Sequence, residues 1–542
     1  MAQQKPHYDL RFEPWIPVER LDGTADVVSI REALAGAHQI RRLSGEIPGE
    51  GIALLRLLLA LVYCINADLE DAGEKGKKGR WEKLRSQGCF GPDQIDEYLA
   101  DYPHEFDLFD NERPFYQVPN LAYMGEKEFD PVCEFMLDVP NPEKGKFLFS
   151  MRSPEHLDSL PFDLAARYLI VVQAYDIAGI KSPVEGNTSV VDGKARAPKG
   201  ALGTGWCGAL GGIYLEGQSL FETLLLNFVL YLNNASVIVP NDYAPWEREA
   251  SPTDTCRREP TGPIDLLTWQ SRRIRLVPGS DGSSVRGVII SYGDILIPAN
   301  KQRFEMMTCW RESERQQKKL GTATVPLMPV VPDTAFALWR GLPSLLALVD
   351  GGKLRPGVIR WMSELQDVQS VDDWRLNVRI VCQGVSYGPN NSVIYDAMTD
   401  SVDLRAGLLR KDSEAVLRLL DVIERTDRAV DALVKFIRHV EQAQGDRRGK
   451  NKKFPDVATK NDVREGAYYA LDALYRSRIA EFPDEGVDEY CLAWRKETRS
   501  VLRRLANAYV SRRHVSCFSE HDDVSVGQAL AWFERDLVKA LF

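Results

Sequence analysis

The last quarter of the chain carries hydrophobic residues at helical spacing. Short, polar or proline-containing linkers separate four amphipathic segments, which lie at about 403–443, 461–480, 488–512 and 524–541. In the first segment Leu417, Leu420 and Ile423 begin a 3.6-residue period, and Arg and Glu occupy the other faces. This pattern predicts a C-terminal four-helix bundle that forms a domain of its own over 403–542.

The first 402 residues have shorter and more varied elements. Apolar runs predict buried helices, and short or alternating runs bounded by turn residues predict strands and hairpins. The expected helices lie at 51–66, 81–101, 161–178, 219–232, 334–350 and 356–368, and the expected strands at 14–18, 264–277 and 285–290. Ser29 followed by Glu32 predicts a helix start with a capping box. The expected fold class is α+β: a large mixed α/β N-terminal domain over 1–402 with β-hairpins and long loops, followed by the four-helix bundle.

A polar turn between two apolar runs at 377–396 predicts a hairpin of two short strands. Gly388 and Pro389 fix the turn, and Asn390 and Asn391 stand at its tip with their amide donors and acceptors available. Taken by itself, this spacing is typical of an ordinary surface hairpin. Only the rest of the chain can favour a functional turn.

Two loops combine glycine with basic residues. The segment 194–212 has glycines at GxGxxG-like spacing, but no strand leads directly into it, and it does not match the phosphate-binding loop of nucleotide hydrolases. Its flexible backbone beside Lys194, Arg196 and Lys199 could approach a nucleic-acid backbone closely. The run KGKFLF at 144–149 could bind phosphates and stack a base, or could equally be a hydrophobic plug that closes a loop.

Composition narrows the possible classes of protein. With 542 residues the chain is too long for one core, and its 44% hydrophobic and 27% charged residues are ordinary for a soluble protein. The net charge of −10 argues against a protein that coats nucleic acid, although basic residues cluster in loops, among them Arg272, Arg273 and Arg275, which also predict a strand with one basic face. The nine cysteines form no CxxC pair, so we expect reduced thiols in a cytoplasmic protein. The start MAQQKPHYDL is unlike a signal peptide, and we expect no contact with membranes.

The sequence carries few signs of known enzyme chemistry. It contains no HExxH and no Cys/His cluster, and its seven histidines are dispersed. A site assembled from distant residues would escape such a search. We expect a protein that is not an enzyme, with no catalytic residues, no cofactor and no metal.

Several of these stretches together resemble a known family. The resemblance rests on WIPV at 15–18, FDLF at 106–109 with RPFYQ at 113–117, the Gly-rich segment leading into SLFETLLLNF at 219–228, and LTWQSRRIRL at 267–276. In their order and spacing they look like the large subunit, CasA type, of the type I-E CRISPR effector complex Cascade. The resemblance spans essentially the whole chain.

The resemblance implies a non-catalytic subunit of an antiviral surveillance complex. Such a subunit recognises the protospacer-adjacent motif (PAM) on double-stranded DNA, helps open the duplex so that guide RNA can pair in an R-loop, and helps recruit the helicase–nuclease. The implied partners are the other Cascade subunits, the 5′ handle of the CRISPR guide RNA, PAM-containing duplex DNA and the nuclease. An alternative is a purely structural scaffold subunit of a nucleoprotein complex that does not read the PAM.

The resemblance also assigns residues to DNA and RNA contacts. Pro389, Asn390, Asn391 and Ser392 correspond to the wedge hairpin that splits the first target base pair, with Asn where some relatives have Gln. The PAM-reading Gly-rich loop corresponds to Ala197, Pro198, Lys199, Gly200 and Gly203. A finger hairpin corresponds to Tyr292, where this chain has no lysine, with Lys301 as the nearest one downstream. Docking on the guide-RNA handle corresponds to Phe149 and Lys146. Some relatives have a zinc site of two CxxC pairs, which this chain lacks.

Overall fold

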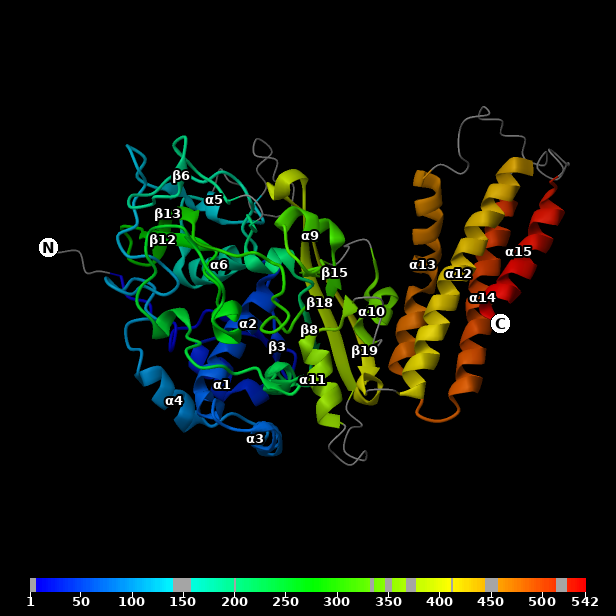
Figure 1. Cartoon of the computed structure of the whole chain (residues 1–542), viewed down its shortest axis with the longest axis horizontal. Helices are drawn as coiled ribbons and strands as arrows, with labels where there is room; N and C mark the ends of the chain where they lie inside the picture. Colours follow the sequence, from blue (N-terminus) through cyan, green and yellow to red (C-terminus); the bar gives the residue numbers. More distant parts are fainter. Residues whose placement is uncertain are drawn as a thin grey trace. The chain divides into compact units, whose positions relative to one another are not determined.

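The computed structural model divides the chain into two compact units. It describes residues 6–139, 157–198, 201–331, 336–346, 353–366, 377–410, 413–443, 457–512 and 524–542. The first unit consists of 1–336, 349–371 and 378–401, and the second of 337–348, 372–377 and 402–542 (Figure 1). The mixed α+β class is as predicted, with strands confined largely to the first unit and long helices to the second.

A small antiparallel sheet begins the first unit. Strand β1 (Ile16–Arg20) lies between β2 (Ala25–Val28) and β3 (Ile40–Leu43). Helix α1 (Ile30–Ala35) follows β2, and both hydrogen bonds of the predicted capping box between Ser29 and Glu32 are present. The side chain of Trp15 is fully buried beside this sheet and donates from its indole nitrogen to the carbonyl of Leu10 (3.1 Å).

Buried helices packed around α2 form the core of the first unit. Helix α2 (Glu50–Ile65) packs against α6 (Phe162–Tyr175), α7 (Leu220–Asn227) and α8 (Pro263–Leu267). The charge that α2 carries in its apolar run, Arg56, is buried and forms a bidentate ion pair with Glu305 (3.1 and 3.0 Å). The helix ends differ from the sequence prediction, since α6 stops at Tyr175 rather than 178 and α7 stops at Asn227 rather than 232. The predicted helix at 81–101 is two helices, α3 (Glu74–Gln87) and α4 (Pro92–Ala100), because Gly88 ends α3 in the left-handed conformation.

Sheets of two to four strands position the remaining loops of the first unit. The longest strands pair as β12 (Arg272–Pro278) with β13 (Ser284–Tyr292), to which β4 (Asp130–Pro131) and β5 (Leu160–Pro161) add short edges. Smaller elements of this unit are α5 (Val132–Phe135), β6 (Val190–Val191), β7 (Lys194–Ala195), β9 (Tyr231–Leu232), β10 (Ala235–Ser236), β11 (Cys256–Arg257), β14 (Asp294–Ile295), β15 (Trp310–Glu312), α9 (Glu314–Leu320), β16 (Leu327–Pro329), β17 (Lys353–Leu354) and α11 (Gly357–Gln366).

Strand β12 lacks the exposed basic face that the sequence predicted at Arg272 and Arg273. Its arginines predicted a basic face, yet the side chains of Arg272 and Arg273 are both 1% exposed and both lie in ion pairs. A buried charge is tolerated only when it is paired and hydrogen-bonded. The two residues therefore belong to the interior of the first unit and are not available as a phosphate-binding surface.

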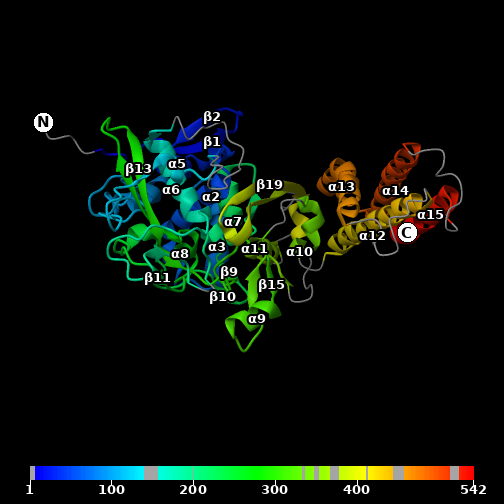
Figure 2. The same cartoon turned by 90° about the horizontal axis from the view of Figure 1, so that it is seen from above.

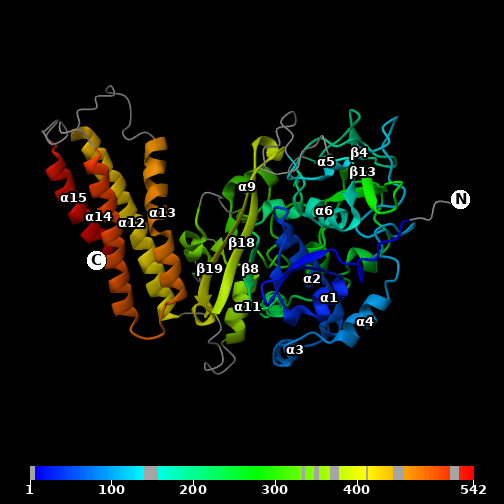
Figure 3. The ribbon, with the colours of Figure 1, turned by 180° about the vertical axis from the view of Figure 1, so that it is seen from behind.

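A long β-hairpin carries the predicted polar turn. Strand β18 (Asn377–Tyr387) lies between β19 (Ile394–Arg405) and β8 (Ile213–Glu216) (Figures 1 and 3). Strands β18 and β8 are antiparallel, and Ile380 lies opposite Leu215. The hairpin is as predicted, but its strands have 11 and 12 residues and are not short. The end of the hairpin is thus built on a regular sheet.

The second unit contains the four predicted helices. They are α12 (Glu414–Ala443), α13 (Val457–Ala480), α14 (Val487–Ser511) and α15 (Val526–Leu541), and Figure 2 shows α12 beside α14 and α15. The first turn of α12 is rotated relative to the prediction, because Leu417 is 66% exposed and Val416 and Leu419 are buried. The short helix α10 (Leu342–Leu346) belongs to this unit, and the preceding Trp339 donates to Asp472 of α13 (2.9 Å). Within the described residues, no helix is long and apolar enough to cross a membrane.

Candidate nucleic-acid interface

Hydrogen bonds hold the backbone of the turn at the end of the β18–β19 hairpin, and the side chains of the turn are exposed. The amide of Gly388 donates to the carbonyl of Val393 (2.8 Å), and the amide of Asn391 donates to the carbonyl of Gly388 (3.0 Å). Asn390 and Asn391 both adopt the left-handed conformation (φ 56° and 54°), which Asn tolerates better than most residues. All four residues 389–392 are exposed. The backbone therefore holds two asparagine amides in solvent, and none of the described residues hydrogen-bonds them.

The turn is fastened to the loop that follows helix α6. The amide of Ala178 donates to the carbonyl of Asn391 (2.8 Å). Just before the turn, the hydroxyl of Tyr387 donates to the carbonyl of Tyr175, the last residue of α6 (2.7 Å). This anchor exists because α6 ends at Tyr175, so that the amide of Ala178 is not used inside a helix.

The same loop holds the Gly-rich segment on its other side. The amide of Gly205 donates to the carbonyl of Asp176 (2.9 Å). A Cβ atom on Gly203 would lie 2.7 Å from the Cβ of Ala178, so glycine at 203 lets the two chains approach closely. The hairpin turn and the Gly-rich segment, which are about 190 residues apart in sequence, are thus both held by the loop 176–178.

One buried arginine joins these segments. The Nη2 of Arg272 donates to the carbonyls of Gly203 (2.7 Å) and Ile177 (3.0 Å), and its Nε donates to the carboxylate of Asp176. The Nζ of Lys181 lies 2.6 Å from the same carboxylate. Burial raises the pKa of Asp176, but the charges of Lys181 and Arg272 outweigh that effect and lower the pKa to about 2. Asp176 is therefore a buried carboxylate with two cationic partners.

Tyr292, which the resemblance places in a finger hairpin, lies under this arginine. The guanidinium carbon of Arg272 is 4.7 Å from the centre of the Tyr292 ring, and the Tyr292 hydroxyl donates to the carbonyl of Gly179 (2.9 Å). The residue is 2% exposed and packs with Ala195 and Ile295. In this structure Tyr292 packs against Arg272 and hydrogen-bonds the segment that follows loop 176–178. Its contact with DNA stays a prediction.

Lys301 is engaged elsewhere. Its Nζ donates to the carbonyl of Ala299 (2.9 Å) and forms an ion pair with Glu259 (2.7 Å), and the residue is 8% exposed. A contact between Lys301 and DNA would have to break that ion pair. Its predicted role is not tested by this structure.

The other predicted residues divide into visible and undescribed positions. Ala197 is half-buried against the cluster of Ala195, Tyr292 and Ile295, and Pro198 is exposed. Lys199 and Gly200 lie outside the described residues, as do Lys146 and Phe149. Just before this segment, β6 and β7 form a hairpin with Asp192 and Gly193 at its turn, and Lys194 and Arg196 are exposed there without an ion pair to any described residue.

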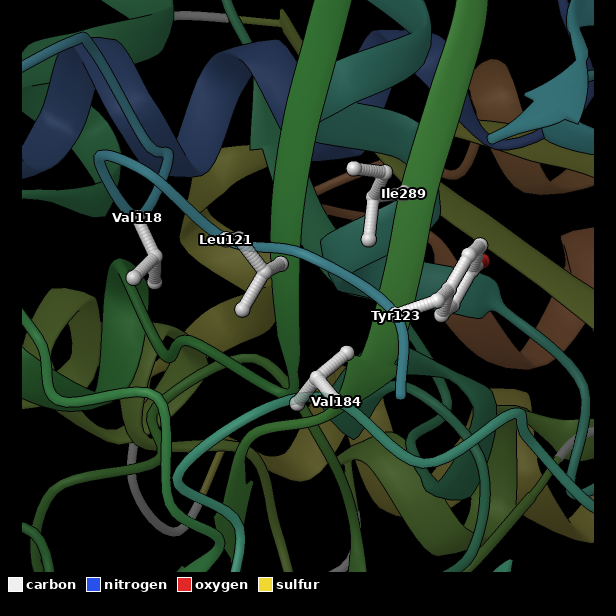
Figure 4. Packing of buried hydrophobic residues seen from close by; sticks show 5 residues of the cluster. All are labelled: Val118, Leu121, Tyr123, Val184 and Ile289. Atoms are coloured by element: carbon white, nitrogen blue, oxygen red, sulfur yellow. The ribbon is translucent and has the colours of Figure 1, made fainter. Parts of the chain in front are cut away.

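The far end of the loop is anchored in a hydrophobic cluster. Val184 packs with Val118, Leu121, Tyr123 and Ile289 of strand β13, and all five are buried (Figure 4). The amide of Met124 also donates to the carbonyl of Pro183 (3.0 Å). The segment 176–184 is therefore fixed at its start by Arg272 and Asp176 and at its end by apolar packing.

Sequence reasoning missed the residues that assemble this site. Loop 176–178 was predicted as the end of a helix, and Arg272 as part of a basic face. The Asp that follows α6 was not singled out. Among the described residues, no group of three or more His, Cys, Asp or Glu side chains could hold a metal ion.

Comparison with known proteins decides the family. The sequence matches the family of CRISPR-associated protein Cse1 over residues 9–505. The chain belongs to the Cse1 family. This confirms the resemblance to the CasA-type large subunit that the sequence indicated.

Three relatives illustrate how far the similarity of this Cse1 protein extends. Cse1 of Thermobifida fusca is 31% identical, with a TM-score of 0.87 over 99% of this chain and 98% of its own. CasA/Cse1 of Thermus thermophilus is 26% identical over 526 residues, covering 95% of this chain and 94% of the relative. A chain in a structure described as a CRISPR RNA-guided surveillance complex is 19% identical with a TM-score of 0.64 over 99% of this chain and 100% of its own, and shares the fold.

A double substitution tests the contact between the two segments of this Cse1 protein. Gly203→Ala should destabilise the first unit by about 1–3 kcal/mol, because its methyl group would lie 2.7 Å from that of Ala178. Adding Ala178→Gly removes the opposing methyl group and should restore most of the loss. The free energy of unfolding of the two single variants and the double variant in urea measures this coupling. Additive losses in the double variant would show that the contact does not matter.

Proposed function

We propose that this Cse1 protein is the non-catalytic large subunit of a CRISPR surveillance complex. In this role it recognises the PAM on duplex DNA, helps open the duplex for pairing with guide RNA and helps recruit the helicase–nuclease. The family and the fold shared with a chain of a surveillance complex support the proposal. Its partners would be the other subunits of the complex, guide RNA and target DNA.

The observation that carries the proposal is the joint anchoring of the two segments that are predicted to bind DNA. The exposed turn 389–392 and the Gly-rich segment share the loop 176–178, so a duplex held by one is presented to the other at a fixed distance. Opening one base step costs a few kcal/mol, and a rigid wedge together with backbone contacts can offset that cost. A wedge that moved independently of the reading loop would lose this advantage, because ordering it would cost entropy.

The negative net charge of the chain fits a protein that contacts DNA at a few positions better than one that encloses DNA in a basic groove. The net charge is −10, and the interior arginines of β12 are neutralised by aspartates. Lys194 and Arg196 beside the Gly-rich segment are exposed cations that could contact phosphates. Sequence recognition beyond the PAM would come from pairing with guide RNA.

The test is PAM-dependent opening by a reconstituted complex that carries Asn391→Gly. Glycine is the right replacement because residue 391 has φ 54°, where alanine would add backbone strain of about 1 kcal/mol. The substitution removes the amide and keeps the turn. We expect opening of PAM duplexes, measured by permanganate reactivity of thymines next to the PAM, to fall about tenfold, while binding to a pre-opened bubble is unchanged.

The matched control is Asn234→Gly. Asn234 is also exposed at a hairpin turn, between β9 and β10, with φ 58°. This variant should open PAM duplexes like wild type. Equal opening by the Asn391→Gly and wild-type complexes would contradict the wedge role and leave a scaffold subunit as the better description.

A further inference from the structure

An exposed tyrosine stands next to the turn. Tyr395, near the start of β19, is 53% exposed, and none of the described residues hydrogen-bonds its hydroxyl. It lies three residues after Ser392, the last residue of the turn. Single exposed hydrophobic residues are common on protein surfaces and need a further observation before they suggest a function.

The ring of Tyr395 packs against Gly388. A Cβ atom on Gly388 would lie 2.6 Å from Cγ1 of Val393, and 2.7 Å from Cζ and 2.9 Å from Cε1 of Tyr395, so these two side chains together occupy the space that a side chain at 388 would need. The backbone of Gly388 (φ −75°, ψ −168°) is open to any residue, so glycine is required here for space and not for conformation. The aromatic ring of Tyr395 thus lies at the base of the turn, beside a residue without a side chain, and about half of Tyr395 is exposed to solvent.

We propose that Tyr395 is a stacking platform for the nucleobase released when the turn splits the first base pair. This inference rests on the proposed function of the turn. A base leaving the duplex loses a stacking neighbour, and an aromatic face replaces it without hydrogen bonds, so any of the four bases can be accepted. Because one side of the ring already packs against Gly388, less side-chain freedom is lost when the base arrives than for a fully solvated ring.

The ligand is an unpaired nucleobase, and it can come from the target strand or from the displaced strand. The experiment uses 2-aminopurine, whose fluorescence falls when it stacks on another ring, at the first position beside the PAM on either strand. The reconstituted complex is mixed with a PAM duplex and with a pre-opened bubble. Quenching in one labelled strand and not in the other identifies the strand that Tyr395 holds.

Four variants separate stacking from packing. Tyr395→Phe keeps the ring and should quench like wild type, whereas Tyr395→Leu should leave the probe bright and weaken binding to the bubble by about 5-fold to 150-fold. Gly388→Ala should also leave the probe bright, because the added methyl group would meet both Val393 and the ring of Tyr395, and Tyr395→Leu separates loss of the ring from a disturbed turn. Tyr243→Leu, at a 49% exposed tyrosine elsewhere in the first unit, should change nothing.

The outcomes separate this inference from the proposed function. A wild-type complex that opens the PAM duplex and leaves the released probe bright on both strands would overturn the stacking role alone. Equal quenching by wild type and Tyr395→Leu would also overturn it. A wild-type complex that fails to open the duplex, yet quenches the probe in the bubble through Tyr395, would overturn the proposed opening function and support stacking.

Discussion

Arg272→Met should abolish PAM-dependent opening and lower the free energy of unfolding by about 3 kcal/mol. Removing one partner of a buried ion pair typically costs about 3–5 kcal/mol, and Lys181 remains beside Asp176 to limit the loss. The same change releases the carbonyls of Ile177 and Gly203. The turn and the Gly-rich segment would then no longer share a fixed support. Urea unfolding and permanganate reactivity on a PAM duplex measure the two effects.

The stability difference should depend on pH in a defined direction. Asp176 has a pKa near 2 in the folded protein, below the ordinary value of 3.8, so its pairing stabilises the protein above about pH 4. That contribution is lost as the pH falls from about 4 towards 2. The difference between wild type and Arg272→Met should therefore shrink over this range. A difference that stays constant down to pH 2 would contradict the assigned pairing.

Arg273→Met is the control for Arg272→Met. Arg273 is the next residue, is equally buried, and pairs with Asp294, which keeps Arg258 as a second partner (2.7 Å). We expect a similar loss of stability but normal opening per folded molecule, because the ion pair of Arg273 is with Asp294 and not with loop 176–178. Loss of opening in both variants would show that general destabilisation, and not the position of the loop, explains the effect.

Gly205→Ala should be the most disruptive substitution in the Gly-rich segment. Its Cβ would lie 2.3 Å from the carbonyl carbon and 2.4 Å from the carbonyl oxygen of Ala174, and these are backbone atoms that cannot move aside. Overpacking of this kind costs about 3 kcal/mol or more. It would also push the amide of Gly205 away from the carbonyl of Asp176. We expect loss of stability in urea and weaker binding of the reconstituted complex to PAM duplexes.

Gly79→Ala controls for the substitution itself. Gly79 is an exposed residue within α3, and a Cβ atom there has no neighbour within 4 Å. Alanine in a helix is favoured over glycine by about 0.5–1 kcal/mol, so this variant should be slightly more stable than wild type. If Gly205→Ala were as stable as Gly79→Ala, the close approach to α6 would be wrong.

The elements that follow from local pattern were predictable from the sequence. The capping box at Ser29, the buried run of α2, the polar hairpin turn and the four long C-terminal helices all have periodic or turn-forming residues that act within a few positions. The family was also recognisable, because its stretches keep their order. The exposure of Asn390 and Asn391 follows from the same local chemistry.

The support of the site could not be predicted, because it depends on partners far apart in sequence. The Nε of Arg272 and the carboxylate of Asp176 meet across 96 residues, and an arginine that alternates with apolar residues looks the same whether it faces solvent or a buried carboxylate. The apolar run of α6 continues past Tyr175 in composition, so its end was placed at 178. Only the folded chain shows that the amide of Ala178 is needed by Asn391.

Under the proposed PAM-reading role of the Gly-rich segment, the contact between Gly203 and Ala178 has a consequence for design. Libraries that vary the Gly-rich segment while leaving position 178 fixed will reject most residues at 203, whatever contacts those residues would make with DNA. Varying 178 and 203 together, with glycine allowed at 178, opens combinations that single-site selection never samples. Among Cse1 sequences the two positions should covary, with a larger residue at one accompanied by a smaller residue at the other.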